Sequence, residues 1–170
     1  MRNAFKYLSQ NHLTTPKEVD RLIISAFLKI NKLQTKYNTF LQAYFIDKSE
    51  KEEYERLNEF VSVIDSDVAH FGFEELIELF EFVISPADRI VNGAIYTPEN
   101  IRKFIVKETL KKQTVISDLF KISDIACGCG GFLFNASIEL KKKVNKSYSD
   151  IFSNHIYGLD IQEYSINRTK

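Results

Sequence analysis

The pattern of apolar and polar positions predicts helices over most of the first ninety residues. Thr15-Pro16-Lys17-Glu18 has the form of a capping box with proline at the first helical position. Apolar residues follow it at helical spacing, namely Val19, Leu22, Ile23, Ala26, Phe27, Ile30 and Leu33. An amphipathic helix is therefore expected to begin after Thr15.

Three further helices are expected before residue 90. Tyr37, Phe40, Leu41, Tyr44 and Phe45 repeat the helical spacing, and Ser49 is expected to cap a third helix that carries Tyr54, Leu57, Val61 and Ile64. A fourth helix is expected from about Phe73 to Ile84. Short connections favour antiparallel neighbours, so residues 1–90 are interpreted as a helical amino-terminal domain. Aromatic residues at this spacing are more often core than base-stacking groups.

The pattern changes in the second half of the chain. Leu119 to Asp124 has the alternation of a short strand, and Ile156 to Asp160 is interpreted as a second, parallel strand. Phe132, Leu133, Ala136 and Leu140 have helical spacing. The expected fold class is α/β, in which a helical bundle over residues 1–90 precedes the first part of a sheet over residues 91–170. Ser85 to Asn92, ending in Gly93, is the expected hinge.

Three glycines mark the turn between the first strand and the helix. Gly128, Gly130 and Gly131 can take positive φ and let a ligand approach the backbone at the carboxyl end of a strand. A dinucleotide fingerprint would need a third glycine where the chain has Leu133, and no glycine is followed by the lysine and hydroxyl residue of a P-loop. A glycine-rich turn without a ligand is the simpler alternative.

Two other positions allow both a structural and a functional interpretation. Thr97-Pro98 is a good helix start, with Thr97 as N-cap, and a helix amino terminus can also bind a carboxylate. Asp160 ends the second strand, where a carboxylate can accept two hydrogen bonds from a ribose diol or cap the helix near Gln162. Asp124 is expected to face the same cleft, and its simple interpretation is a turn acid.

Charge divides the chain unevenly although its formal net charge is zero. Residues 50–82 contain eleven carboxylates against Lys51 and Arg56, a surface that would repel phosphates. Lys141, Lys142, Lys143 and Lys146 form the one basic cluster, and a solvated helix end is favoured over DNA binding there. DNA contact through the acidic segment is not expected.

Other kinds of chemistry receive little support from the sequence. Cys127 and Cys129 need two more ligands for a tetrahedral zinc site, and the three histidines are not spaced to provide them. No metal is therefore expected, and Cys127 is interpreted as a buried, inert thiol. No apolar run approaches the roughly 20 residues of a membrane span, and the amino terminus lacks a secretory signal core. A cytoplasmic location without membrane contact is expected.

Taken in order, three motifs resemble the amino-terminal part of bacterial adenine-specific DNA methyltransferases, the type I modification subunits and related fused restriction-modification enzymes. That family has Tyr/Phe-Thr-Pro, then Asp-Pro-Ala-Cys-Gly-Ser-Gly-Gly-Phe, then Gly-x-Asp/Glu. The chain has Tyr96-Thr97-Pro98, Asp124 to Phe132 and Gly158-Leu159-Asp160. It departs at Ile125 and Cys129, and neither change removes a contact that a backbone could supply. The resemblance runs from about Ile90 to the end.

The resemblance implies a Rossmann-like domain that binds S-adenosylmethionine and methylates the exocyclic amine of adenine in DNA. Asp160 would hold the ribose, Asp124 would lie near the methionine ammonium, Thr97 would meet the methionine carboxylate, and Tyr96 would flank the cofactor. The cofactor-binding residues so implied are Tyr96, Thr97, Pro98, Asp124, Ala126, Gly128, Gly130, Gly131, Phe132, Asp160 and Ile161.

The family's catalytic loop, Asn/Asp-Pro-Pro-Tyr/Phe, has no counterpart in the chain. Its prolines follow Thr15, Ser85 and Thr97. We therefore expect the chain to stop before that loop, to hold no catalytic residue and to be inactive alone, as the front of a larger enzyme.

The expected partners follow from this interpretation. They are DNA, through parts outside this chain, a specificity or restriction subunit, and a second copy of the fragment, because an incomplete sheet leaves strand edges open. The alternatives are a non-catalytic helical interaction module with a vestigial cofactor pocket, or a methyltransferase acting on protein or a small molecule.

Overall fold

The computed structural model describes residues 1–10, 15–84, 96–113 and 115–170. It divides the chain into two compact units, Met1–Pro86 (unit 1) and Ala87–Lys170 (unit 2). The domain boundary expected at residue 90 and the hinge expected from Ser85 to Gly93 lie outside the described residues. Both stay predictions.

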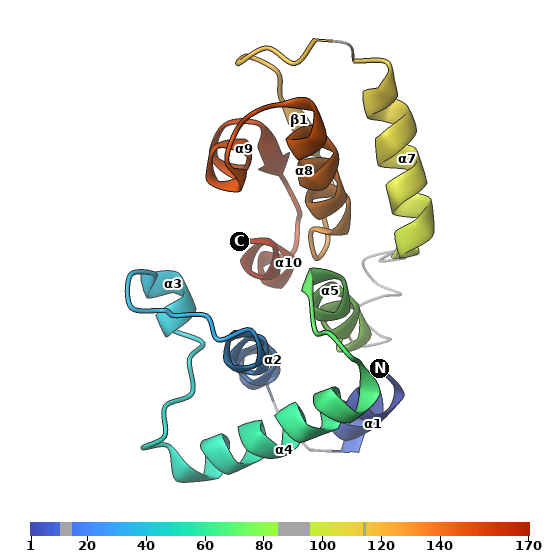
Figure 1. Cartoon of the computed structure of the whole chain (residues 1–170). Helices are drawn as coiled ribbons and strands as arrows, with labels where there is room; N and C mark the ends of the chain where they lie inside the picture. The colour runs from blue at the N-terminus through green and yellow to red at the C-terminus, as the bar shows by residue number, and fades with distance from the viewer. Residues whose placement is uncertain (11–14, 85–95, 114) are drawn as a thin grey trace. The chain divides into compact units, whose positions relative to one another are not determined.

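Unit 1 is helical (Figure 1). Its elements are α1 (Arg2–Gln10), α2 (Pro16–Ile30), α3 (Thr39–Gln42), α4 (Lys51–Asp67) and α5 (Phe73–Phe82). Helices α1 and α2 both pack against α4, and α2 also packs against α5. The core between them contains Leu22, Ile23, Leu57, Phe60, Ile64, Phe71 and Leu79, each at most 2% exposed. Burial of one apolar stripe from each long helix accounts for this packing.

The sequence located the start of α2 correctly and its end less well. The Thr15 capping box forms, with the Thr15 hydroxyl accepting a hydrogen bond from the Glu18 N–H and the Glu18 carboxylate accepting one from the Thr15 N–H. The helix ends at Ile30, so Leu33 lies beyond it and is 48% exposed. Helix α1, which buries Ala4, was not expected.

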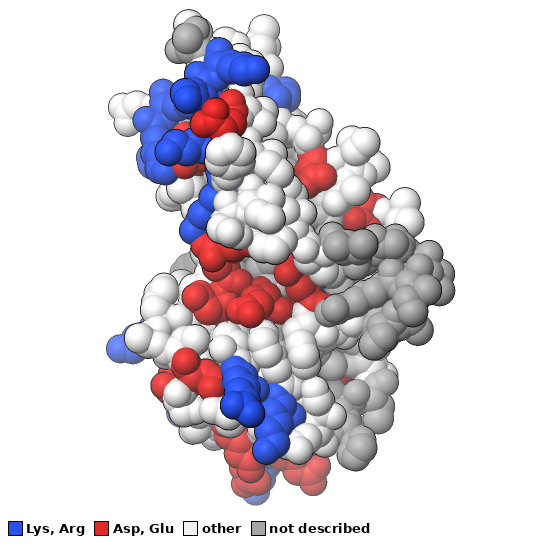
Figure 2. Space-filling view, turned by 90° about the vertical axis from the view of Figure 1, so that its right-hand side faces the viewer, with Lys and Arg blue, Asp and Glu red and all other residues white. Residues whose placement is uncertain are grey.

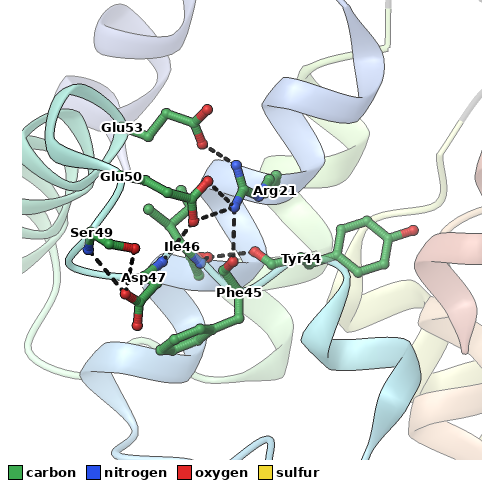
Figure 3. A network of polar contacts seen from close by, with 9 residues as sticks. Arg21, Tyr44, Phe45, Ile46, Asp47, Ser49, Glu50 and Glu53 are labelled. Atoms are coloured by element: carbon green, nitrogen blue, oxygen red, sulfur yellow. Dashed lines mark hydrogen bonds and ion pairs between the residues drawn. The ribbon is translucent and has the colours of Figure 1, made fainter.

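The helix expected from Tyr37 to Phe45 is reduced to the four residues of α3, and Tyr37 is 89% exposed. After α3 the chain continues in single turns, in which the Tyr44 and Phe45 N–H groups donate to the Leu41 and Gln42 carbonyls. The Ser25 hydroxyl donates to the Tyr44 carbonyl at 2.6 Å, and the Arg21 guanidinium donates to the Phe45 carbonyl at 3.0 Å. These two bonds tie the end of the segment to α2 (Figure 3).

The start of α4 also differs from the prediction. Glu50, rather than Ser49, is the N-cap residue and makes no side-chain capping bond. Ser49 donates instead to the Asp47 carboxylate from both its N–H and its hydroxyl. The Glu50 carboxylate accepts from Arg21 at 2.7 Å, and Glu53 pairs with the same guanidinium (Figure 3). Arg21 thus ties α2 to the first turn of α4.

Unit 2 combines helices with a parallel sheet, which confirms a mixed α/β chain. Its elements are α7 (Glu99–Lys111), β1 (Ile122–Asp124), α8 (Gly131–Lys143), α9 (Tyr148–Asn154), β2 (Ile156–Gly158) and α10 (Glu163–Thr169). Strands β1 and β2 pair in parallel, with Ile122 opposite Ile156 and Asp124 opposite Gly158. Helix α8 lies against both strands, with α7 and α9 packed against α8 (Figure 1).

Each strand is shorter than predicted. Leu119 is 86% exposed and lies before β1, because the chain turns at Ser117 to Phe120 before pairing begins. Strand β2 ends at Gly158, and the Leu159 carbonyl then accepts a hydrogen bond from the Cys127 N–H. The described residues therefore contain two strands of three residues each.

A buried histidine, which the sequence did not single out, fixes α9 to the start of β1. His155 is 1% exposed, and its Nδ1 lies 2.7 Å from the Phe120 carbonyl while its Nε2 lies 2.9 Å from Lys146 Nζ. An ammonium group only donates, so Nε2 accepts and Nδ1–H donates to the carbonyl.

Across the described segments, no helix has the length and apolar character that a membrane span requires.

Candidate functional site

The loop between β1 and α8 makes a turn that requires glycine. Gly128 has φ 53° and Gly130 has φ 82°, both in the left-handed region. The Gly130 N–H donates to the Cys127 carbonyl at 2.8 Å, and Gly130 is the N-cap residue of α8. An L-residue at either position would raise the energy of the fold by about 1–2 kcal/mol, because its Cβ crowds the backbone at these angles. We refer to residues 125–130 as the glycine turn.

Asp160 joins the end of β2 to the glycine turn. Its Oδ2 accepts a hydrogen bond from the Gly128 N–H at 2.9 Å, and its Oδ1 accepts one from the Gln162 N–H at 2.8 Å. A carboxylate has roughly four lone-pair sites, so these two bonds leave acceptor capacity for a further group. The second bond closes a turn before α10, whose N-cap residue is Gln162, so the interpretation of Asp160 as the helix cap is wrong.

Backbone hydrogen bonds hold the same two corners together. The Leu159 N–H donates to the Asp124 carbonyl at 2.9 Å, and the Cys127 N–H donates to the Leu159 carbonyl at 3.0 Å. The Asp124 carboxylate accepts from the Ala126 N–H at 3.0 Å. Asp124 therefore shapes the entry of the turn, which is the role that the turn-acid interpretation gave it.

Tyr96 and Arg102 bring the third motif to the glycine turn. A Cβ on Gly128 would lie 3.1 Å from Tyr96 Cε1, so the Tyr96 ring covers this glycine closely. Arg102, 5% exposed, donates from Nη1 to the Thr97 carbonyl at 2.7 Å. A Cβ on Gly131 would lie 2.7 Å from Arg102 Nε. The three motifs thus meet at the carboxyl ends of the two strands.

The expected N-cap at Thr97 is wrong. Pro98 takes that position, with φ −54° and ψ 146°, and its carbonyl accepts from the N–H groups of Ile101 and Arg102. The fixed φ of proline suits an N-cap as well as the first helical position, and the bond from Arg102 to the Thr97 carbonyl keeps Thr97 outside the helix. Thr97 is half-buried and Pro98 is exposed.

The remaining predicted site residues differ in their exposure. Ala126 is exposed, and the Ile161 side chain is 84% exposed. Phe132 is half-buried and packs against the core of unit 2. Their roles toward a cofactor stay predictions.

Both cysteines are buried at this turn, Cys127 at 5% and Cys129 at 4% exposure. Burial raises the pKa of the Cys127 thiol, which favours the protonated and unreactive form. Where the structure describes the chain, no three His, Cys, Asp or Glu side chains gather as metal ligands.

Two contributors to the site, Arg102 and Thr169, had no signal in the sequence, and a third, Gly158, stood there only as part of a motif. The Thr169 hydroxyl lies 2.9 Å from the Gly128 carbonyl and 2.9 Å from the Ser165 carbonyl, and both carbonyls can accept its proton. Gly158 lets β2 approach α8, because a Cβ there would lie 2.7 Å from Leu133 Cδ1. Only the Gly of Gly158-Leu159-Asp160 belonged to a motif, and no local pattern marks the other two.

Comparison with known families agrees with the motifs that meet here. The family model described as N-6 DNA Methylase matches residues 74–170, more than half of the chain. The match begins in α5, earlier than the resemblance near Ile90 suggested. No curated protein and no solved structure matches the chain.

Proposed function

Because the chain belongs to the N-6 DNA methylase family, we propose that unit 2 is the S-adenosylmethionine-binding front of a Rossmann-like, adenine-specific DNA methyltransferase. The observation that carries this proposal is the meeting of Tyr96, Gly128 and Asp160 at the carboxyl ends of two parallel strands. Parallel α/β sheets bind ligands at this edge.

Each residue has a chemical role in this proposal. The unused acceptor sites of Asp160 take the ribose hydroxyls, and the left-handed backbone at Gly128 gives the ligand close access to the turn. Tyr96 flanks the cofactor, and Asp124 attracts the methionine ammonium. The amino terminus of α7 after Pro98 offers N–H groups and a dipole to the methionine carboxylate.

The reaction proposed for the whole enzyme is direct displacement, in which the adenine amine attacks the methyl carbon, the sulfonium leaves as a thioether, and the methylated amine releases one proton to solvent. The sulfonium is already an activated donor, so the protein mainly aligns the reactants. The chain itself contains no Asn-Pro-Pro or Asp-Pro-Pro sequence. Alone, it is expected to bind the cofactor without transferring the methyl group. A restriction-modification context and a specificity subunit belong to the same proposal.

The test is calorimetric titration of the 170-residue chain with S-adenosylhomocysteine. Asp160→Asn removes the charge and keeps one oxygen, which can accept from only one of the two backbone N–H groups. It should weaken binding about 10- to 100-fold, since hydrogen bonds to charged groups contribute about 1.5–3 kcal/mol. Asp118→Asn is the matched control, because the Asp118 side chain is 89% exposed and pairs with Lys146.

A second ligand isolates the ribose contact. An S-adenosylhomocysteine analogue without the two ribose hydroxyls should bind the wild-type chain more weakly and should be insensitive to Asp160→Asn. If the folded wild-type chain binds neither ligand, or if both ligands respond equally to the substitution, the proposed role of Asp160 is wrong.

A further inference from the structure

Lysines gather at the end of unit 2 that lies opposite the glycine turn. Helices α7 and α8 run in the same direction, because Arg102 lies at Gly131 near their starts and Lys143 Nζ donates to the Gln113 carbonyl at 3.2 Å near their ends. Lys121, just before β1, contacts the Asn154 carbonyl at the end of α9. We call this surface the lysine end. Its residues are Lys111, Lys112, Lys121, Lys141, Lys142, Lys143 and Lys146.

The lysine end keeps a positive excess after its internal ion pairs are counted. Lys111 pairs with Glu108, Lys142 with Glu139 and Lys146 with Asp118. Among the described residues, no carboxylate lies at ion-pair distance from the other four, which are Lys112, Lys121, Lys141 and Lys143. Figure 2 shows this gathering of cationic side chains at its upper end, with carboxylates among them.

Helix-end stabilisation does not account for the whole surface. The carboxyl termini of α7 and α8 each carry about half a negative charge, so together they offset about one of the four unpaired lysines. Lys121 contacts the carboxyl end of a third helix, α9, which offsets about half a charge more, and Lys146 lies outside the helices. Three separate segments thus supply ammonium groups to one surface.

This surface is separate from the proposed cofactor site. Helix α8 has 13 residues between the glycine turn and the lysine end, and at 1.5 Å per residue it places them about 20 Å apart. The stretch of DNA that presents a base at the carboxyl ends of the strands would therefore not reach the lysine end.

We propose that the lysine end binds the phosphate backbone of duplex DNA without sequence preference, as a contact additional to the one that presents the adenine. Lysine ammonium groups are point charges that suit phosphates, and phosphate contacts position a protein on DNA without reading its bases. The family match identifies DNA as the macromolecule on which such proteins act. The competing occupant, the acidic residues 50–82 of a second copy, is distinguished by experiment.

The test measures binding of the whole chain to a fluorescent duplex of G·C pairs only, by anisotropy at several salt concentrations. Four phosphate contacts predict a slope of log K against log salt of about −3.6, which is a loss of about 150-fold between 50 and 200 mM salt. The combined variant Lys112→Gln, Lys121→Gln and Lys143→Gln should reduce the slope to about −1 and weaken binding at least tenfold at 50 mM salt.

The charge-matched control replaces three exposed lysines of unit 1, Lys17→Gln, Lys36→Gln and Lys48→Gln, and should leave the affinity and the slope nearly unchanged. A second variant, Lys112→Gln and Lys143→Gln, changes two exposed positions at helix ends and removes two of the four contacts, so the slope should fall to about −1.8. It keeps the test valid if the first variant unfolds in thermal melts.

Three outcomes would overturn the proposal: equal losses in the unit 1 control and the lysine-end variants, no binding to the G·C duplex, or a strict requirement for adenine. If the lysine-end variants instead abolish concentration-dependent association in sedimentation and leave DNA affinity intact, the surface binds another copy of the chain. Titration with S-adenosylhomocysteine is expected to be the same for all variants, so failure here is distinct from failure of the cofactor proposal.

Discussion

At Asp160, one carboxylate both shapes a turn and is proposed to hold a ligand. The carboxylate accepts a hydrogen bond from the Gly128 N–H. No L-residue fits well at position 128, since φ is 53° and a Cβ there would lie close to the Tyr96 ring. The shape of the corner therefore depends on two residues far apart in the sequence. Substitutions at either one are expected to affect stability and cofactor binding together.

Gly128→Ala is expected to lower the free energy of unfolding by about 1–2 kcal/mol, because alanine at positive φ is strained. The measurement is urea denaturation. Adding Tyr96→Ala separates backbone strain from crowding, since it removes the ring that a Cβ would approach at 3.1 Å but leaves φ unchanged. A double variant as stable as Tyr96→Ala alone would show that backbone strain contributes nothing.

Tyr7 provides a pH-dependent prediction in unit 1. Burial, with the nearby Glu59 carboxylate, raises the pKa of Tyr7 from 10.0 to about 12. A pKa higher in the folded state means that the folded chain keeps a proton that the unfolded chain loses, so this contribution is complete below pH 10 and disappears as the pH rises through 12. Urea denaturation at pH 9 and pH 11 should show a smaller alkaline loss of stability for Tyr7→Phe than for the wild type.

Single-residue predictions from the sequence succeeded where the signal was local. The Thr15 box involves residues three apart, and it formed as predicted. Thr97 and Ser49 failed as caps because nearby residues outside the capping pattern, Arg102 and Asp47, determine their bonds. Thr169 could not be found at all, since its contact with Gly128 joins residues 41 positions apart.

Among the elements, α2 and α4 depend on Arg21 for their mutual placement. Its guanidinium contacts two carboxylates of the first turn of α4 and the carbonyl before it (Figure 3). Arg21→Ala is expected to lower the free energy of unfolding by about 1–2 kcal/mol, a value kept small because the partners are partly exposed. Lys17→Ala, exposed on the same helix, is the control.

The same pair has a defined pH dependence. The hydrogen bond from Arg21 holds the pKa of Glu50 below its ordinary value of 4.5. A lowered pKa contributes stability that is present above 4.5 and is lost as the pH falls through the folded-state pKa. The difference between wild type and Arg21→Ala in urea denaturation should therefore shrink on acidification. A difference that stays constant from pH 7 to pH 3 would contradict this role.

Element prediction from the sequence was good for long amphipathic helices and poor for short elements. The apolar stripes of α2 and α4 are each long enough to specify a helix, and Leu57 and Ile64 are buried as expected. The aromatic run from Tyr37 to Phe45 has helical spacing, but it forms the four-residue α3 and single turns, and α2 binds the carbonyls at its end. Helix α9 was missed, although Ser147 and Asp150 form a capping box that was visible in the sequence.

For the whole molecule, each unit contains its own buried core. Ile64 belongs to the core of unit 1, and Leu140 belongs to the core of unit 2. Truncating either side chain to alanine should cost about 2–5 kcal/mol. Amide hydrogen exchange is expected to show lost protection mainly in the unit that carries the substitution. Equal loss in both units for both variants would mean that the chain unfolds as one cooperative body.

At this scale the sequence predicted the class of the chain but not the details of its sheet. The order of Tyr96-Thr97-Pro98, the glycines and Asp160 indicated one site, and the three motifs do meet in unit 2. The strands were overestimated because Leu119 and Leu159 look like strand residues but are exposed. Pairing between β1 and β2, which no local pattern specifies, sets where each strand ends.

The burial of both thiols beside the glycines makes them a natural reporter of motion at this corner. Cys127 and Cys129 are the chain's two cysteines, so an alkylating reagent can modify the protein at no other thiol. Modification requires the loop to open, and its rate measures how often that happens. Mass spectrometry over time should show slow labelling that S-adenosylhomocysteine slows further and that Gly128→Ala accelerates.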